Sequence, residues 1–367
     1  MLIWRSLAGR LLGGGALTAL IVTLLWSGAI RVTGAVGTDE TIRIRALPAA
    51  TPATSPPDVP ATPQVRIAAV GDLMFARDIV DLTAGDPGYP FARVAGLFAG
   101  ADLLIGNFEG TLTDRGTALD KMYTFRAPLD RVDSLTGAGF TAVSLGNNHV
   151  GDFGAISVTD TTGTLDGAGV RYAGAGADAE AARRPAVLRA PRANVVLLSY
   201  SGVDESAFAG AARAGVARAS IEAMTEDVRA ARMTTPFVVV ALHAGTEYER
   251  EPTAFQRAFD RAAIDAGAAL VIGHHPHVLQ GWERYRGGVI LYSLGNFVFD
   301  LEQADMDTLG PAPFETGVAV VTLHAGAAPD VVFRPAVIDV RENRPRPATD
   351  VEAARIAQAF REFAPTP

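Results

Sequence analysis

The sequence contains no cysteine in 367 residues, so disulfide bonds and thiolate metal sites are both excluded. Lysine is almost absent as well: Lys121 is the only one, although arginine, alanine and glycine are abundant. We interpret this bias as the codon usage of a GC-rich genome. The net charge is −8 and no clustered basic segment is visible, which argues against nucleic acid as a partner.

The long apolar stretch in the sequence lies near the N-terminus, at 11–30, and carries no charge. A helix of about 20 residues rises about 30 Å, roughly the hydrocarbon thickness of a bilayer. Arg5 and Arg10 precede the stretch, and Arg31 follows it. The positive charge on the N-terminal side favours a location of residues 1–10 in the cytoplasm. We predict a retained single-pass signal anchor in the cell membrane with an extracytoplasmic C-terminal domain. The alternative is a cleaved signal peptide.

Residues 31–64 turn polar and then rich in proline, which favours an extended polyproline II spacer. We assign 31–64 to a linker, 65–345 to the folded domain, and 346–367 to a C-terminal helix and tail. With 49% hydrophobic residues, the chain can bury the core of one large α/β domain or of two modest domains.

Beyond the linker, short apolar runs alternate with amphipathic segments, a rhythm typical of the α/β class. The later runs follow one another with short turns, which predicts a mixed sheet or a two-sheet sandwich flanked by helices. Helices are predicted at 220–233 and 253–266. Strands are predicted at 65–70, 103–105, 141–145, 195–200, 237–242, 270–272, 289–292, 317–323 and 331–340.

Polar side chains follow five of these strands at their carboxyl ends. Because strand ends of a layered α/β fold share one rim, we expect these side chains to surround a single site. Glycine stands beside each polar phrase, as tight turns require. The residues are Asp72; Asn107 and Glu109; Asn147, Asn148 and His149; His243, Glu247 and Glu249; and His274, His275 and His277.

The phrase GHHPHVLQG places three of the six histidines within four positions, directly after a predicted strand. Such a strand end predicts a metal site, although the histidines could instead hydrogen-bond the turn at Pro276. Carboxylate, amide and imidazole ligands suit one or two ions of Mn, Fe or Zn, and the imidazoles argue against a purely magnesium site. Two ions about 4 Å apart would stabilise in-line displacement at phosphorus. His149 is then the candidate general acid, and Asp152 can orient it.

Seven phrases occur in the order GDLMFAR, GNFEGTLTD, YTFRAP, SLGNNHVGDFG, HAGTEYE, GHHPHVLQG and YSLGNFVFD. They resemble the CapA family of poly-γ-glutamate capsule biosynthesis proteins over roughly 66–300. That family is similar to the calcineurin-like metallophosphoesterases, so the resemblance implies a two-sheet β-sandwich flanked by helices, a four-layer αββα fold. It implies the metal ligands Asp72, Glu109, Asn148, His243, His275 and His277, with Met74 where a ligand histidine is expected and Glu109 in place of a bridging aspartate.

Three further residues are candidates for substrate binding. Arg126 can clamp a phosphate or carboxylate through two hydrogen bonds, and Tyr123 can form a wall of the site. The alternative for Arg126 is a surface arginine beside a packed aromatic ring. Asn296, in the turn after a strand, can hydrogen-bond a histidine or a substrate, or can simply hold the turn.

Two functional classes remain open. The first is a membrane-anchored, metal-dependent hydrolase that acts outside the cytoplasm on a phosphoester or on the polymer itself. The second is a non-catalytic subunit that binds an anionic surface polymer and works with other capsule synthase subunits. The resemblance favours a role in capsule biosynthesis or export in either class.

Overall fold

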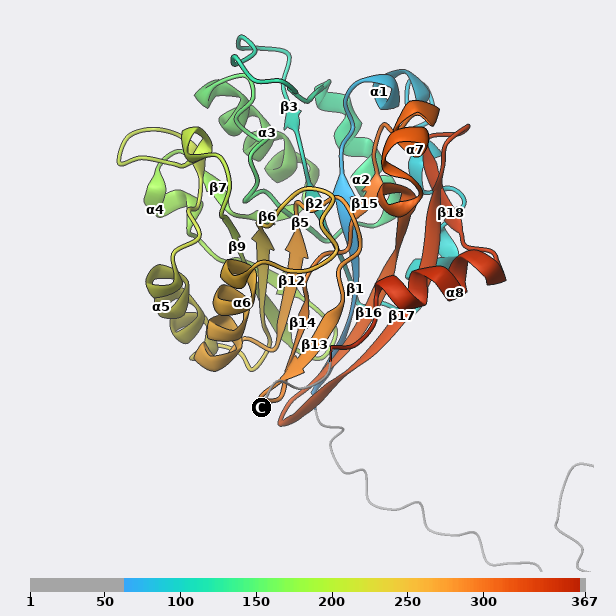
Figure 1. Cartoon of the computed structure of the whole chain (residues 1–367). Coiled ribbons are helices and arrows are strands. Elements are labelled where there is room, and N and C mark those ends of the chain that lie inside the picture. Colours follow the sequence, from blue (N-terminus) through green and yellow to red (C-terminus); the bar gives the residue numbers. More distant parts are fainter. Residues whose placement is uncertain (1–62, 364–367) are drawn as a thin grey trace, which may run out of the picture. The chain divides into compact units, whose positions relative to one another are not determined.

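The computed structural model describes residues 63–363. The predicted cytoplasmic segment 1–10, the predicted anchor 11–30 and nearly all of the predicted linker lie outside these residues. Within 63–363, no helix combines the length and the apolar character needed to cross a membrane. The described part has the predicted α/β class and is built around two large sheets (Figure 1).

The first sheet has eight strands in the order β18-β17-β16-β1-β2-β5-β6, and β15 pairs with the end of β1. Strands β1, β2, β5 and β6 run parallel, whereas β16, β17 and β18 are antiparallel to their neighbours. The bounds are β1 (Gln64–Leu73), β2 (Leu103–Phe108), β5 (Ala142–Ser144), β6 (Arg171–Ala173), β15 (Asn296–Val298), β16 (Glu315–His324), β17 (Ala327–Asp339) and β18 (Arg344–Pro347).

The second sheet has six strands in the order β13-β14-β12-β11-β9-β8, of which the four inner strands run parallel. The bounds are β8 (Ala186–Arg189), β9 (Asn194–Ser201), β11 (Val238–His243), β12 (Leu270–His274), β13 (Trp282–Tyr285) and β14 (Gly288–Leu291). Two small ribbons pair β3 (Thr111–Leu112) with β4 (Arg126–Ala127), and β7 (Ala175–Gly176) with β10 (Gly215–Val216).

Local sequence explains where the principal helices begin. Ser220 caps α5 by accepting from the backbone N–H of Ala223, and Thr253 and Gln256 form a reciprocal capping box at α6. The helices are α1 (Asp78–Leu82), α2 (Val132–Ala138), α3 (Ala155–Ala168), α4 (Ala179–Ala182), α5 (Ile221–Arg232), α6 (Ala254–Ala266), α7 (Gln303–Leu309) and α8 (Asp350–Ala359).

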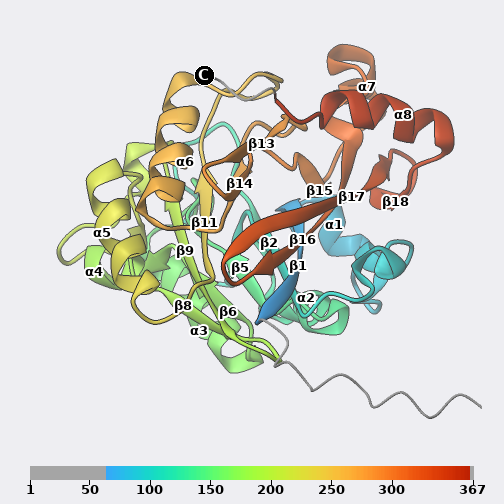
Figure 2. The ribbon, with the colours of Figure 1, turned by 90° about the horizontal axis from the view of Figure 1, so that it is seen from below.

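Three apolar clusters organise the packing. The first is shared by both large sheets and contains Ile67 and Ile105 from one and Leu197 and Val239 from the other. The second joins the first sheet to α2 and α3, and the third joins the second sheet to α5 and α6. Figures 1 and 2 both show α5 and α6 together beside β9, on the side away from β1. Since strands alternate their side chains, each sheet buries both of its faces.

Helix α6 carries one buried acid, Asp260, whose carboxylate has no counterpart in the described part of the chain to compensate for its burial. Asp260 is fully buried, and neither carboxylate oxygen has a hydrogen-bond partner among the described residues. Burial and nearby Glu283 hold the pKa of Asp260 well above its usual range. Because the folded-state pKa exceeds the unfolded one, Asp260 costs stability increasingly as pH rises above about 3.9. We expect Asp260→Asn to raise the free energy of unfolding by roughly 1 to 3 kcal/mol at pH 8, and by less at pH 5.

Urea denaturation at the two pH values measures this difference. The control is Asp265→Asn on the same helix, where the carboxylate is partly exposed and pairs with Arg286 at 2.8 Å. That variant should change the free energy of unfolding by less than about 0.5 kcal/mol. Equal effects in both variants would contradict the explanation by burial.

Candidate metal centre

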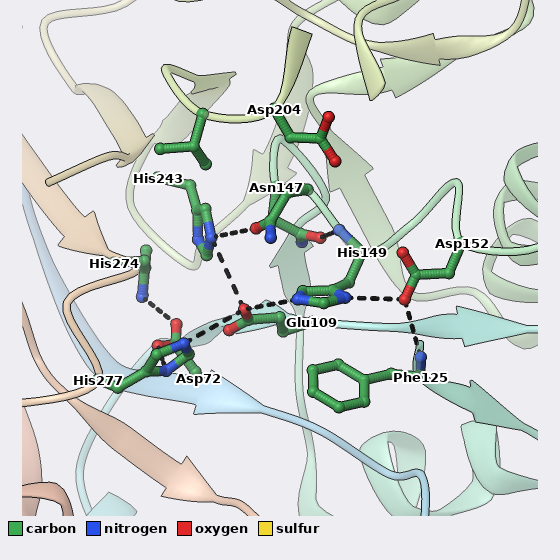
Figure 3. A network of polar contacts seen from close by, with 12 residues as sticks. Asp72, Glu109, Phe125, Asn147, His149, Asp152, Asp204, His243, His274 and His277 are labelled. Atoms are coloured by element: carbon green, nitrogen blue, oxygen red, sulfur yellow. Dashed lines mark hydrogen bonds and ion pairs between the residues drawn. The ribbon is translucent and has the colours of Figure 1, made fainter. Parts of the chain in front are cut away.

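Two pairs of parallel strands carry the site, one pair in each large sheet. Asp72 of β1 lies opposite Asn107 of β2, and His243 of β11 lies opposite His274 of β12. All four residues are buried and lie at or next to the carboxyl ends of their strands. The strand ends that we predicted to share a rim do lie together (Figure 3).

Glycine precedes two of these positions because the chain there has no room for a side chain. A Cβ atom at Gly71 would lie 1.9 Å from the carbonyl oxygen of Gly295, and one at Gly273 would lie 1.9 Å from that of Tyr292. We predicted these glycines for tight turns. Their role is instead to let neighbouring segments of backbone approach closely.

The carboxylate of Glu109 lies at the centre of the site. Its Oε1 atom is 3.7 Å from Nε2 of His243, 3.8 Å from Nε2 of His277 and 3.9 Å from Nε2 of His149. These distances are too long for hydrogen bonds, and Oε1 has no hydrogen-bond partner among the described residues. Two ligands bound to one ion at about 2.1 Å are typically 3 to 4 Å apart, so the spacing suits a shared cation.

Asp72 supplies a second buried carboxylate. Its Oδ1 atom lies 3.2 Å from Nδ1 of His274 and its Oδ2 atom lies 3.3 Å from Nδ1 of His277. Burial alone would raise the pKa of Asp72, but the two imidazoles hold it well below its usual range. At Glu109 the nearby imidazoles do not outweigh burial. Burial and the charge of Asp72 together raise the pKa of Glu109 well above its usual range. The centre therefore buries two neighbouring carboxylates, and a bound cation would offset the repulsion between them.

Asn107 connects the two carboxylates and was not among our predicted ligands. Its Nδ2 atom donates to Oδ1 of Asp72 at 2.9 Å, and it lies 3.5 Å from Oε2 of Glu109 and 3.3 Å from Nδ1 of His243. Asn147 in turn donates to Oδ1 of Asn107 at 3.1 Å. These amides hold the ligands from both sheets in place. Their position directly after predicted strands was the sequence feature that could have indicated this role.

His243 and Asn148, both predicted ligands, face each other. Nε2 of His243 lies 2.8 Å from Oδ1 of Asn148, so either atom is placed to contact an ion beside Glu109. Burial and the neighbouring His275 keep the pKa of His243 well below its usual range, and burial and His277 lower the pKa of His275 to about 3. Neutral imidazoles are the form that binds metals.

His277 is oriented from behind by Asn296. The Nδ1 atom of His277 lies 2.9 Å from Oδ1 of Asn296, whose amide nitrogen donates to the backbone carbonyls of His277 and Pro313. Nδ1 therefore carries the proton of neutral His277, and Nε2 stays available toward Glu109. Burial lowers the pKa of His277, but Glu109 and Asp72 outweigh it and raise the value to about 9. In the metal-free chain His277 is therefore protonated at neutral pH, and a bound ion would take the place of the proton on Nε2. Asn296, which we considered for substrate binding, is buried and holds this histidine.

His149 lies on the opposite side of Glu109. Its Nδ1 atom is 2.7 Å from Oδ2 of Asp152, and the same oxygen accepts from the backbone N–H of Phe125 (Figure 3). Burial lowers the pKa of His149, although Asp152 acts in the other direction. The predicted pair of His149 and Asp152 is thus in hydrogen-bond contact, with Nε2 directed at the centre of the site.

Lys121 holds Asp152, the partner of His149, in place. We interpreted the rarity of lysine as codon usage and did not predict this role. The ammonium group of Lys121 donates to the backbone carbonyl of Asn148 at 2.6 Å and to Oδ1 of Asp152 at 2.8 Å. It also pairs with Asp204, in the loop after β9, at 3.1 Å. Three acceptors around one nitrogen match an ammonium better than a planar guanidinium. A single lysine in an arginine-rich chain was the signal for a specific role.

Three residues considered earlier do not join the cluster. The guanidinium of Arg126 packs 3.6 Å from the ring centre of Phe153 and donates to the carbonyls of Arg115 and Gly116. That matches the alternative of an arginine beside a packed ring. Tyr123 is exposed, and Met74 is buried in the apolar core, where its sulfur accepts from the backbone N–H of Ala76.

The donor set fits a divalent transition metal. One ligand atom each of Asp72, Glu109 and His243 lie within 4.8 Å of one another. Oδ2 of Asp72, Oε1 of Glu109 and Nδ1 of His275 are buried without a hydrogen-bond partner in the part of the chain that is described. Such atoms are costly when left unpaired, and carboxylate with imidazole is a donor set suited to Mn, Fe or Zn.

Comparison with known proteins gives a match, over residues 66–301, to the family described as bacterial capsule synthesis protein PGA_cap. The chain is 34% identical over 247 residues to the capsule biosynthesis protein CapA of Bacillus anthracis, covering 63% of this chain and 59% of that protein. It is also 34% identical over 236 residues to the PGA biosynthesis protein CapA of Bacillus subtilis strain 168, which covers 63% of this chain and 62% of that protein. The match thus spans less than two thirds of either relative.

A probable polyglutamine synthesis accessory protein of Mycobacterium tuberculosis is 35% identical over 214 residues, which are 55% of this chain and 56% of that protein. Among solved structures, TT1561 of Thermus thermophilus aligns with 10% identity and a TM-score of 0.39, over 71% of this chain and 99% of that one.

Proposed function

Because the chain belongs to the PGA_cap family of bacterial capsule synthesis proteins, we propose that it acts in the synthesis or export of an anionic surface polymer, poly-γ-glutamate or a related one. The names of its relatives, CapA and polyglutamine synthesis accessory protein, support this role. Its partners in this proposal are the polymer or a phosphoester substrate, and other subunits of the capsule synthase.

We propose that the described part has the calcineurin-like metallophosphoesterase fold, a four-layer αββα sandwich. The support comes from the three apolar clusters, one shared by both large sheets and one joining each sheet to a pair of helices. The position of the polar residues at the carboxyl ends of parallel strands is also typical of an α/β ligand site.

Within this role we propose metal-dependent hydrolysis. The observation that carries it is the buried, unpaired Oε1 of Glu109, surrounded by Nε2 atoms of three histidines. One or two ions of Mn, Fe or Zn would be held by Asp72, Glu109, Asn148, His243, His275 and His277. A bound ion supplies a Lewis acid for ester oxygens. His149, held at Nδ1 by Asp152, is placed to give a proton from Nε2 to the leaving oxygen.

The alternative is a non-catalytic subunit that binds the polymer through a degenerate metal site. The burial of Met74 where a ligand histidine is expected favours it, as does the word accessory in the name of one relative. The two functions differ in turnover. A hydrolase loaded with Mn²⁺ or Zn²⁺ cleaves a phosphoester or a γ-glutamate oligomer, whereas a binding subunit retains the oligomer intact, as chromatography of the products would reveal.

We further propose that 11–30 anchors the chain in the cell membrane with the domain outside the cytoplasm. The uncharged stretch preceded by Arg5 and Arg10 supports this topology. Protease added to intact protoplasts should then remove the domain from about residue 65 onward, as detected by immunoblotting. A cytoplasmic marker protein serves as the control for lysis. Protection of the domain while the protoplasts stay intact would contradict the topology.

A further inference from the structure

The loop that follows β11 is pressed against the histidine loop that follows β12. The backbone N–H of Tyr248 donates to the carbonyl of Pro276 at 2.8 Å, and that of Ala244 donates to the carbonyl of His274 at 3.1 Å. At Gly245, with φ of +132°, a Cβ atom would lie 3.0 Å from the ring of Pro276. The two loops therefore fit together without room for a larger residue at this point.

Both loops contain non-glycine residues with positive φ angles, which are unfavourable backbone conformations for them. The φ angles are 63° at Tyr248, 95° at His275 and 57° at His277. Positive φ is uncommon outside glycine, and for a bulky residue it costs of order 1 to 3 kcal/mol. All three residues adjoin or contact the same corner at Pro276. Such conformations persist where the surrounding structure imposes them, and they concentrate at functional sites.

The consequence of this docking is the position of Glu247, the residue before Tyr248. One carboxylate oxygen of Glu247 and one ring nitrogen each of His275 and His277 lie within 4.8 Å of one another. Glu247 is exposed, whereas both histidines are buried. Two imidazoles and one carboxylate, with an open side, form the ligand set of many catalytic zinc sites.

Met74 stands where the family resemblance leads us to expect a ligand histidine, and a thioether is a poor ligand for such an ion. The thioether of Met74 is fully buried and accepts a hydrogen bond at 3.1 Å, so it offers nothing to an ion. Glu247 follows β11 of the second sheet, whereas Met74 follows β1 of the first, so the two residues lie far apart along the chain. The folded chain brings Glu247 to the same rim.

We propose that Glu247 is a metal ligand and that, with His275 and His277, it forms a second ion position beside the one held by Asp72, Glu109 and His243. This inference rests on the proposed metal-dependent function and defines the composition of that same site. The ligand is a divalent transition ion, Mn²⁺ or Zn²⁺. Because Glu247 is exposed, this second position faces the side from which a substrate arrives.

Calorimetric titration with Mn²⁺ and Zn²⁺ tests the proposal on the full-length chain, purified in detergent and stripped with a chelator. The wild-type chain should bind two ions. Glu247→Gln should bind one with unchanged affinity and lose at least about 100-fold in affinity for the other, more than loss of an outer-shell partner usually costs. The control is Glu249→Gln, two residues along the same loop. We expected Glu249 at the site, but its side chain is exposed and belongs to neither cluster, so this variant should still bind two ions.

Two results would overturn the assignment of Glu247 while leaving a metal site in place. One is a Glu247→Gln chain that binds two ions with wild-type affinity. The other is a wild-type chain that binds one ion, with an affinity that Glu247→Gln does not change but Asp72→Asn does. A wild-type chain that binds no ion would instead overturn the proposed metal-dependent function together with this inference.

Discussion

Replacing His149 with asparagine should lower the turnover of the metal-loaded protein by about 10² to 10⁴ on phosphoesters with a poor leaving group. The Nε2 atom of His149 faces the centre of the site, 3.9 Å from Oε1 of Glu109, and Asp152 holds its Nδ1 atom at 2.7 Å. An asparagine amide keeps a polar group there but is far too weak an acid to protonate a leaving oxygen. Steady-state rates with an alkyl phosphate measure the loss.

The same variant should lose far less on an activated aryl phosphate, because a good leaving group departs without a proton. Asp152→Asn, which loosens His149, should give a smaller defect in the same direction. His324→Asn serves as the control, since His324 pairs with Asp330 at the surface, away from the cluster. Equal losses on both kinds of ester would rule out the general-acid role. No turnover by the wild-type chain, with polymer production intact in cells carrying His149→Asn, would favour the binding subunit.

Glu109→Gln should affect metal binding and stability in opposite directions. Metal analysis should find the ion held by Asp72, Glu109 and His243 lost, because the substitution removes the central charged ligand. In metal-free protein the same substitution should raise the free energy of unfolding by roughly 1 to 3 kcal/mol at pH 8, since an unpaired buried carboxylate is removed. The pKa of Glu109 is raised in the folded state, so its cost grows with pH and the gain should be smaller at pH 5.

A core variant provides the contrast. Leu270 of β12 is fully buried between the sheets, and Leu270→Ala should destabilise the chain by about 2 to 5 kcal/mol while stoichiometric metal is retained. Urea denaturation and metal analysis of the two variants should therefore give reversed patterns. Loss of stability without loss of metal in Glu109→Gln would contradict a metal centre at this position.

Local sequence predicted the elements whose apolar pattern is strong. Each of the nine predicted strands overlaps an observed strand, and α5 and α6 begin one residue after the positions predicted for them, since Ser220 and Thr253 are their caps. Helix α3 was not predicted. Its sequence AISVTDTTGTLDGA is rich in threonine and glycine, which are weak helix formers. Packing compensates, because Leu165 is buried and Thr161 accepts from the backbone of Leu112.

Individual roles near the site were harder to predict than its position. Arg126 follows an aromatic phrase that suggested a substrate clamp, yet its side chain packs on Phe153. Lys121 stands in a loop without a recognisable motif, and its importance comes from contacts with Asp152 and Asp204. Both outcomes depend on where a long side chain turns after the loop has folded, and local sequence does not determine that direction.

The sequence by itself determined the chemistry that this protein can offer: carboxylates, amides and imidazoles without thiolates, placed at the carboxyl ends of apolar strands. Those features are local, since an apolar run and the polar residue after it lie next to each other in the chain. The tertiary structure decided which of them meet. Asp72 and His277 face each other at 3.3 Å because an apolar cluster packs two sheets together, and the docked loop beyond β11 adds Glu247. Contacts between such distant residues depend on packing across the whole domain.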